Sequence, residues 1–339
     1  MADIAIMDLV VNVLIIAVSF LVLNWASNLT INNALNVSRI TRLGKTAVGF
    51  SLIAFSTSLP ELTVAAVAVL SGGAALSVGN VLGSNIVNIC LVVGLAAFIL
   101  YMRQRKKNDD TSRSTVIPNF AKHELSNIHF GLLVASVVPL ILIYVVQATW
   151  VVGLMLISVF VIYMYQMAKV RMPEEESEVV TPEERSKLKR YVLFTILGAL
   201  GVVVGANFLV DSAVVIAQSI GLSETIIGAT IIAIGTSLPE LTLDLKAFVG
   251  GHSALALGDI IGSSFVNITL ILGITLFLPA LMGRAIVMNM VAYQNIVIFS
   301  IITNLFFWYF LSQGKLNLKE GALFLFIYLL FIATTLGLL

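Results

Sequence analysis

The sequence predicts an all-α polytopic membrane protein with about ten transmembrane helices. Three observations favour this class: 59% of the 339 residues are hydrophobic, only 11% are charged, and the mean hydropathy is +1.04. These values are typical of chains that cross a bilayer several times, and soluble domains rarely reach them. The formal net charge of +1 gives no reason to expect a nucleic-acid partner. The lipid bilayer is the expected partner, and the sequence indicates no obligatory protein partner.

Ten apolar runs, five in each half of the chain, are each about long enough to span a bilayer, which takes roughly 20 residues. No positively charged segment with a cleavage site precedes the first run, so that run is expected to be retained. The connections 102–127 and 169–190 are expected to be solvated connectors. We therefore divide the chain into a first half (1–168), a cytoplasmic linker (169–190) and a second half (191–339). The expected spans are 7–27, 47–70, 77–101, 130–146, 150–168, 191–218, 226–249, 254–281, 286–311 and 323–339.

The basic residues orient this map. If the N-terminus is outside, 17 of the 19 Lys and Arg residues fall in cytoplasmic connections, which leaves Arg284 outside and Lys246 within a span. Such a bias follows the positive-inside rule, so both termini are expected to be extracytoplasmic. The single cysteine, Cys90, excludes an internal disulfide.

One stretch of the chain occurs twice. Residues 49–94 and 228–273 align without a gap at a constant offset of 179, and 22 of the 46 positions are identical, including the run TSLPELT. Five crossings separate the two copies, so they run in opposite directions through the membrane. Inverted repeats of this kind, interrupted by Pro and Gly at matching places, are typical of secondary transporters.

Each copy places a glutamate directly after a proline, near the middle of a predicted span. These are Glu61 after Pro60 and Glu240 after Pro239. A carboxylate at that depth is costly and is a functional candidate by default. Two inverted copies would bring the glutamates face to face, and paired carboxylates with other oxygen ligands suit Ca²⁺ better than Mg²⁺.

Oxygen atoms close to each glutamate could complete such a site. Proline removes a backbone donor and opens the helix, which frees carbonyl groups near Ala54, Thr57, Ala233 and Thr236. Hydroxyl and amide side chains lie beside them, at Ser58, Ser84, Asn88, Ser237, Ser263 and Asn267. The alternative is that the hydroxyls bond back to their own helices and that the amides join neighbouring helices.

Two pairs of glycines four residues apart, Gly79 with Gly83 and Gly258 with Gly262, are expected to let helices approach closely.

The two copies resemble the α-repeats of the calcium/cation antiporter superfamily, particularly those of prokaryotic sodium/calcium exchangers. The matching segments are STSLPE (56–61) with GNVLGSN (79–85), and GTSLPE (235–240) with GDIIGSS (258–264). The resemblance implies that Glu61 and Glu240 hold Ca²⁺ together with backbone oxygens of Thr57 and Thr236. It also implies that sodium sites around them use Ala54, Ser58, Ser84, Asn88, Ala233, Ser237, Ser263 and Asn267, and that the first and sixth spans move across the core.

The second copy departs from the first at several polar positions. Asn267 stands where some branches have Asp, so the central site is expected to carry two formal negative charges. Asp244, which replaces Ala65, shares a helix face with Glu240 and is expected to line an inner vestibule. Lys246, which replaces Val67, is expected to snorkel or to pair with Asp244 or Asp259. Asp259 and Ser264 replace Asn80 and Asn85, and no role is assigned to Asp211.

The sequence thus favours an antiporter in a prokaryotic cell membrane that exchanges Ca²⁺ for Na⁺, with no cofactor, no ATP and no covalent chemistry. A Ca²⁺/H⁺ antiporter of the same superfamily is the first alternative, and the Ser and Asn set around the glutamates favours sodium. An intramembrane aspartyl protease is a remote alternative, because Asp211, Asp244 and Asp259 are unduplicated whereas the glutamates are duplicated. A purely scaffolding protein would not need two buried carboxylates.

Overall fold

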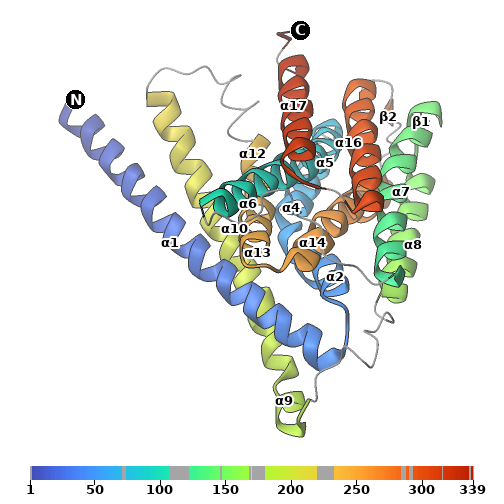
Figure 1. Cartoon of the computed structure of the whole chain (residues 1–339). Helices are drawn as coiled ribbons and strands as arrows, with labels where there is room; N and C mark the ends of the chain where they lie inside the picture. Colours follow the sequence, from blue (N-terminus) through green and yellow to red (C-terminus); the bar gives the residue numbers. More distant parts are fainter. Residues whose placement is uncertain are drawn as a thin grey trace.

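The computed structural model describes residues 2–70, 74–106, 122–145, 147–167, 169, 180–219, 233–283, 288–289, 293–314, 316–335 and 337–338. Nearly all of them are helical, which confirms the predicted all-α class (Figure 1). The first half contains α1 (Ala2–Thr41), α2 (Lys45–Val48), the π-helix η1 (Gly49–Ile53), α3 (Ala54–Thr57), α4 (Leu59–Leu70), α5 (Ala74–Ile86), the π-helix η2 (Val87–Val93), α6 (Gly94–Lys106), α7 (Lys122–Val145) and α8 (Trp150–Met167). The rest contains α9 (Pro182–Ser186), α10 (Leu188–Ser219), α12 (Ala233–Thr236), α13 (Leu238–Val249), α14 (Ser253–Val266), the π-helix η6 (Asn267–Ile271), α15 (Leu272–Leu281), α16 (Gln294–Gln313) and α17 (Leu318–Thr335).

Membrane-spanning character is confirmed for much of this helical framework. By length and composition, seven of the described helices can cross a membrane, or eight if the bent pair 45–57 and 59–66 counts as one span. The segment 129–143 is a shorter apolar helix. The seventh predicted span, 226–249, and the second copy of the repeat both begin outside the described residues, which resume at 233.

The first helix is longer than the predicted span, since α1 continues past residue 27 to Thr41. Polar side chains in this extension return hydrogen bonds to their own helix: Thr30 donates to the Ala26 carbonyl and Asn33 to the Leu29 carbonyl. This internal pairing lets the helix continue where the apolar run ends.

The first helices of the two halves, α1 and α10, pack side by side and run antiparallel (Figure 1). Three glycines of α10 pack on α1: Gly198 against Thr30, Gly201 against Ala26, and Gly205 against Leu23. The residue numbers rise along α10 as they fall along α1, as expected for antiparallel helices. In Figure 1 the start of α1 and the end of α17 lie at the same end of the bundle, with α9 at the opposite end. The described chain thus starts and ends at one end of the bundle, and the linker helix α9 lies at the other.

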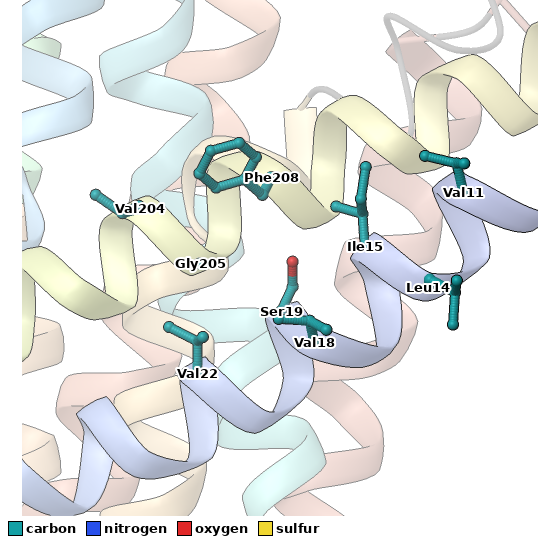
Figure 2. A pocket seen from close by; sticks show the side chains of 9 residues that line it. All are labelled: Val11, Leu14, Ile15, Val18, Ser19, Val22, Val204, Gly205 and Phe208. Carbon is teal, nitrogen blue, oxygen red and sulfur yellow. The ribbon is translucent and has the colours of Figure 1, made fainter. Parts of the chain in front are cut away.

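A pocket of about 460 Å³ lies between α1 and α10 (Figure 2). Val11, Val18 and Phe208 are among the apolar side chains that line it, and Ser19 is the one polar side chain among its lining residues. Several of the apolar side chains are exposed at the outer surface of the pair. The pocket is therefore a lipid-facing groove, and its chemistry does not suit an inorganic cation.

The linker between the halves contains more structure than a plain connector. Thr181 caps α9 in a reciprocal arrangement with Glu184, and Glu184 also pairs with Arg39 at the end of α1. The Thr181 cap of α9 and the Arg39–Glu184 ion pair together connect the end of α1 to the start of the second half. A two-stranded antiparallel ladder, β1 (Gln147–Ala148) with β2 (Met288–Asn289), forms a second link between the halves.

Candidate cation-binding site

Both copies of the repeat break at the same position. Ser58 separates α3 from α4 with φ −78° and ψ 7°, and Ser237 separates α12 from α13 with φ −92° and ψ 8°. The prolines that follow sit in the first turn of α4 and α13, where a missing N–H is tolerated. The helix therefore opens just before Pro60 and Pro239, as predicted, and the first break bends its span by 41°.

The π-helices also recur at matching places, since η2 contains Asn88 and η6 begins at Asn267. A wider helical turn of this kind is common where side chains must be re-aimed at a functional site.

The helix α14 lies at the centre of the bundle, and every residue from Leu255 to Val266 is buried. Two glycines let it reach the first copy of the repeat. Gly258 packs on the backbone of Thr46, and a Cβ at Gly262 would lie 2.5 Å from the Phe50 carbonyl oxygen. The predicted close approach is confirmed for this pair. The corresponding partners of Gly79 and Gly83 would be residues 225 and 229, which lie outside the described residues.

The two glutamates are buried near one another. Glu61 is 1% exposed and Glu240 is fully buried, and they are close enough for their charges to repel. Within the described part of the chain, none of their four carboxylate oxygens has a hydrogen-bond partner. An unpartnered carboxylate in a low-dielectric interior is strongly destabilising, so these oxygens require a cation or a proton.

The hydroxyl groups at the breaks line the same region. Thr57 Oγ1 lies 3.3 Å from the carbonyl oxygens of Ile53 and Ala54 and 3.4 Å from Asp259 Oδ1. The Ala54 carbonyl also accepts the Ser58 N–H at 3.0 Å, so the break does not free this carbonyl from its backbone hydrogen bond, contrary to the prediction. Thr236 donates to Asn80 Oδ1 at 3.4 Å. The structure thus gives Thr57 and Thr236 matching partners in the opposite copy.

Several neutral polar atoms have no hydrogen-bond partner among the residues that the structure describes. The hydroxyls of Ser58, Ser84 and Ser237 are buried and unpartnered, as are both polar atoms of the Asn88 side chain. These are four of the residues that the sequence singled out as ligands. Ala233 lies at the start of α12, and its side chain is outside the described set.

In the second copy, Ser263 donates to Asp259 Oδ1 at 3.4 Å. Asn267 donates to Asn85 Oδ1 at 3.0 Å, and its own Oδ1 has no partner among the described residues. The alternative of an interhelical hydrogen bond is therefore realised for the nitrogen of Asn267 and not for its oxygen.

Two further carboxylates join the glutamates. Asp244 and Asp259 are each 1% exposed, and each has one carboxylate oxygen with no hydrogen-bond partner in the described ranges. Both are close enough to Glu240 for their charges to repel it, and they also interact with each other. The expectation of two formal charges counted too few acidic groups, because Asp244 on α13 and Asp259 on α14 lie close to Glu240 and add to Glu61 on α4. The expectation that Asp244 lines an inner vestibule does not hold in this structure, because its side chain is only 1% exposed.

Among the described residues, no Lys or Arg forms an ion pair with these four carboxylates. Lys246 donates instead to the backbone carbonyl of Asn24 on α1, and to Asn24 Oδ1 at 2.7 Å. The predicted pairing of Lys246 with Asp244 or Asp259 is wrong, because Lys246 projects from the opposite face of α13. Asp211 is exposed on α10.

Within the described part of the chain, no three side chains of Asp, Glu, His or Cys are grouped to hold one metal ion. A cation between the glutamates would therefore need neutral oxygens as well, and Ca²⁺ ordinarily takes six to eight oxygen ligands of mixed kind. The predicted ligand set omitted Asn80 and Asn85, which accept hydrogen bonds from Thr236 and Asn267. The signal for both was their place in the segment 79–85, at positions where the second copy has Asp259 and Ser264.

Comparison with known proteins gives the following similarities. The sequence profile described as sodium/calcium exchanger protein matches residues 11–169 and 190–337. An uncharacterised membrane protein of Methanocaldococcus jannaschii is 30% identical over 318 residues, which cover 93% of this chain and 94% of that protein. The sodium/calcium exchanger MaX1 of Methanosarcina acetivorans is 26% identical, over 79% of this chain and 84% of that protein. Among solved structures, the sodium-calcium exchanger NCX_Mj superposes with a TM-score of 0.78 at 26% identity, over 96% of this chain and 99% of that one.

Proposed function

The chain belongs to the sodium/calcium exchanger family, and on that premise we propose that it exchanges Ca²⁺ for Na⁺ by alternating access. Family membership and the likeness to NCX_Mj make it a calcium/cation antiporter of the membrane. The sodium coupling and the residue roles are the proposal. The relative MaX1, named a sodium/calcium exchanger, supports sodium as the counter-ion.

One observation carries the proposal. Glu61 and Glu240 follow two matching helix breaks, are buried close enough for their charges to repel, and have no hydrogen-bond partner on any carboxylate oxygen among the described residues. Such a pair suits a divalent cation that neutralises both charges at once. Carbonyl oxygens of Thr57 and Thr236, beside the breaks, would complete its coordination.

Sodium would use the surrounding neutral oxygens together with the same two carboxylates. The proposed ligands are drawn from Ala54, Ser58, Ser84, Asn88, Ala233, Ser237, Ser263 and Asn267. Because Na⁺ and Ca²⁺ would compete for Glu61 and Glu240, binding of one ion excludes the other. The empty site cannot easily change sides, because two carboxylates without a bound cation would have to cross the apolar barrier at high energetic cost. Each change of access therefore carries either Na⁺ or Ca²⁺, and the two fluxes are coupled.

Access would alternate when α1 and α10 move as a pair across the core formed by α4, α5, α13 and α14. The tight packing of these two helices on one another supports movement as a unit. We place both termini outside the cell and the linker 169–190 in the cytoplasm of a prokaryotic cell. The first half (1–168) and the second half (191–339) would then each carry one copy of the ion-binding repeat.

A Ca²⁺/H⁺ antiporter is the second candidate, and one observation favours it. Asp244 and Asp259 add two buried carboxylates that form no ion pair with a Lys or Arg among the described residues. Protons could neutralise these groups in the return step. The relative CaxA of Alkalimonas amylolytica, named a putative antiporter, is 28% identical over 82% of this chain and does not decide between the ions.

The test uses purified protein in sealed liposomes and radioactive Ca²⁺. Uptake is followed with an outward Na⁺ gradient, with an equal K⁺ gradient and with a pH gradient. The proposal expects uptake that requires Na⁺ and persists when the pH gradient is collapsed. Uptake that follows the pH gradient and ignores Na⁺ would establish the proton-coupled alternative, and no flux under any gradient would refute both.

A further inference from the structure

Asn85 lies on α5, one residue after the predicted ligand Ser84, and is 1% exposed. It makes two contacts with the second copy of the repeat. Its Nδ2 donates to the Ser264 backbone carbonyl at 3.4 Å, and its Oδ1 accepts from Asn267 Nδ2 at 3.0 Å. Asn85 therefore connects the backbone of α14 to the Asn267 side chain at the start of η6.

The direction of these hydrogen bonds is fixed by chemistry. A backbone carbonyl can only accept, so the amide nitrogen of Asn85 must face Ser264. Its oxygen then turns towards Asn267, and Asn267 must present its own nitrogen to that oxygen. The remaining atom, Asn267 Oδ1, is buried and has no hydrogen-bond partner among the described residues.

The symmetric position lacks this arrangement. Asn88 is the counterpart of Asn267, and the counterpart of Asn85 is Ser264, whose hydroxyl donates to the Ile260 carbonyl at 3.0 Å. Both polar atoms of the Asn88 side chain are without a partner among the described residues. One amide of the pair is thus oriented by a neighbour, and the other is not.

We propose that Asn85 is a positioning residue that holds the Asn267 amide with its oxygen, and not its nitrogen, towards the transported cations. The inference rests on the proposed function, in which Asn267 is a sodium ligand. An amide can present either an acceptor or two donors, and only the acceptor attracts a cation. Because Asn85 accepts from Asn267 Nδ2, it excludes the orientation in which that nitrogen faces the ion, as outer-shell partners do at metal sites.

The experiment measures the Na⁺ concentration that gives half-maximal Ca²⁺ exchange in liposomes. Asn85→Ser gives the first copy the residue that the second copy has at this position. We expect it to raise this Na⁺ concentration about tenfold, which is the lower end of the range of effects for loss of an outer-shell partner. Asn267→Ala should raise it at least as much. Ser264→Ala is the matched control, because it removes only a hydroxyl bonded to its own helix, and it should leave the value within about twofold.

The double variant Asn85→Ser/Asn267→Ala separates positioning from simple packing. If Asn85 acts through Asn267, its substitution has no further effect once Asn267 is alanine, whereas general structural damage adds to the first effect. Additive effects, or an Asn85→Ser protein with wild-type Na⁺ dependence beside an impaired Asn267→Ala protein, would overturn the inference. If Asn267→Ala itself leaves Na⁺ dependence unchanged, the proposed role of Asn267 as a ligand fails, and the positioning inference fails with it.

Discussion

The two copies of the repeat share one scaffold. Each breaks at a serine before a proline and places a buried glutamate on the next turn. The contacts across the copies match as well: Thr57 lies 3.4 Å from Asp259, and Thr236 lies 3.4 Å from Asn80. The backbone geometry of the site is therefore symmetric within the described residues.

Their side-chain chemistry is not symmetric. The second copy has Asp244 and Asp259 where the first has Ala65 and Asn80. Both aspartates join the glutamates in one buried cluster, so the second copy supplies three of its four carboxylates. The comparison teaches that the scaffold determines where a cation can bind, whereas the substituted positions determine how much charge it meets.

The largest expected effect comes from the symmetric pair. Glu61→Gln and Glu240→Gln should each lower Na⁺-driven Ca²⁺ uptake at least about a hundredfold. The attraction of unit charges 4 Å apart is roughly 4 kcal/mol at an effective dielectric constant of about 20, and each 1.4 kcal/mol is about tenfold. Uptake in liposomes measures this, with Glu183→Gln in the exposed linker helix as the control. Wild-type uptake by either site variant would break the proposed equivalence of the two copies.

An intermediate effect is expected where the copies differ by one charge. Asp259→Asn gives the second copy the residue of the first and keeps an acceptor for Thr57, as Asn80 provides for Thr236. Loss of a more distant charge should weaken the apparent Ca²⁺ affinity by about tenfold. The double variant Asp259→Asn/Asn80→Asp restores the total charge and should recover most of that affinity. An unchanged affinity in Asp259→Asn would mean that this carboxylate does not act on the ion.

The smallest effect is expected at Lys246, whose counterpart is Val67. Lys246→Val removes the hydrogen bonds between α13 and Asn24 on α1, and one hydrogen bond contributes about 0.5–1.5 kcal/mol. The maximal exchange rate should change a few-fold, while the Ca²⁺ affinity stays within about twofold. Stopped-flow exchange measures both quantities. Asn24→Leu should change the maximal exchange rate less in the Lys246→Val background than in the wild type. A tenfold loss of Ca²⁺ affinity in Lys246→Val would instead place this lysine in the ion site.

The sequence predicted the features that depend on local chemistry. Proline at 60 and 239 predicts an opened helix, and the structure has both breaks at the expected residue. Spacing predicted that Asp244 shares a face with Glu240, because residues four apart meet on a helix. Duplication predicted which polar residues cluster, and most of those described are buried together.

Features that depend on contacts between distant segments were not predictable. Lys246 pairs with Asn24, and nothing in either local sequence marks the other as a partner. Asp259 is four residues from Ser263 on α14, yet the close packing at Gly262 also brings it to Thr57. Asn85 acquires its neighbour Asn267 only when α5 meets η6 across the bundle.

The most direct test of the central claim is equilibrium binding of radioactive Ca²⁺ to the purified protein at increasing Na⁺ concentration. If both ions need Glu61 and Glu240, Na⁺ raises the apparent Kd for Ca²⁺ without lowering the maximal amount bound, and Glu61→Gln/Glu240→Gln binds neither ion. If Na⁺ leaves the Kd unchanged, or lowers only the maximal binding, the two ions do not compete for this pair of carboxylates, and the account is contradicted.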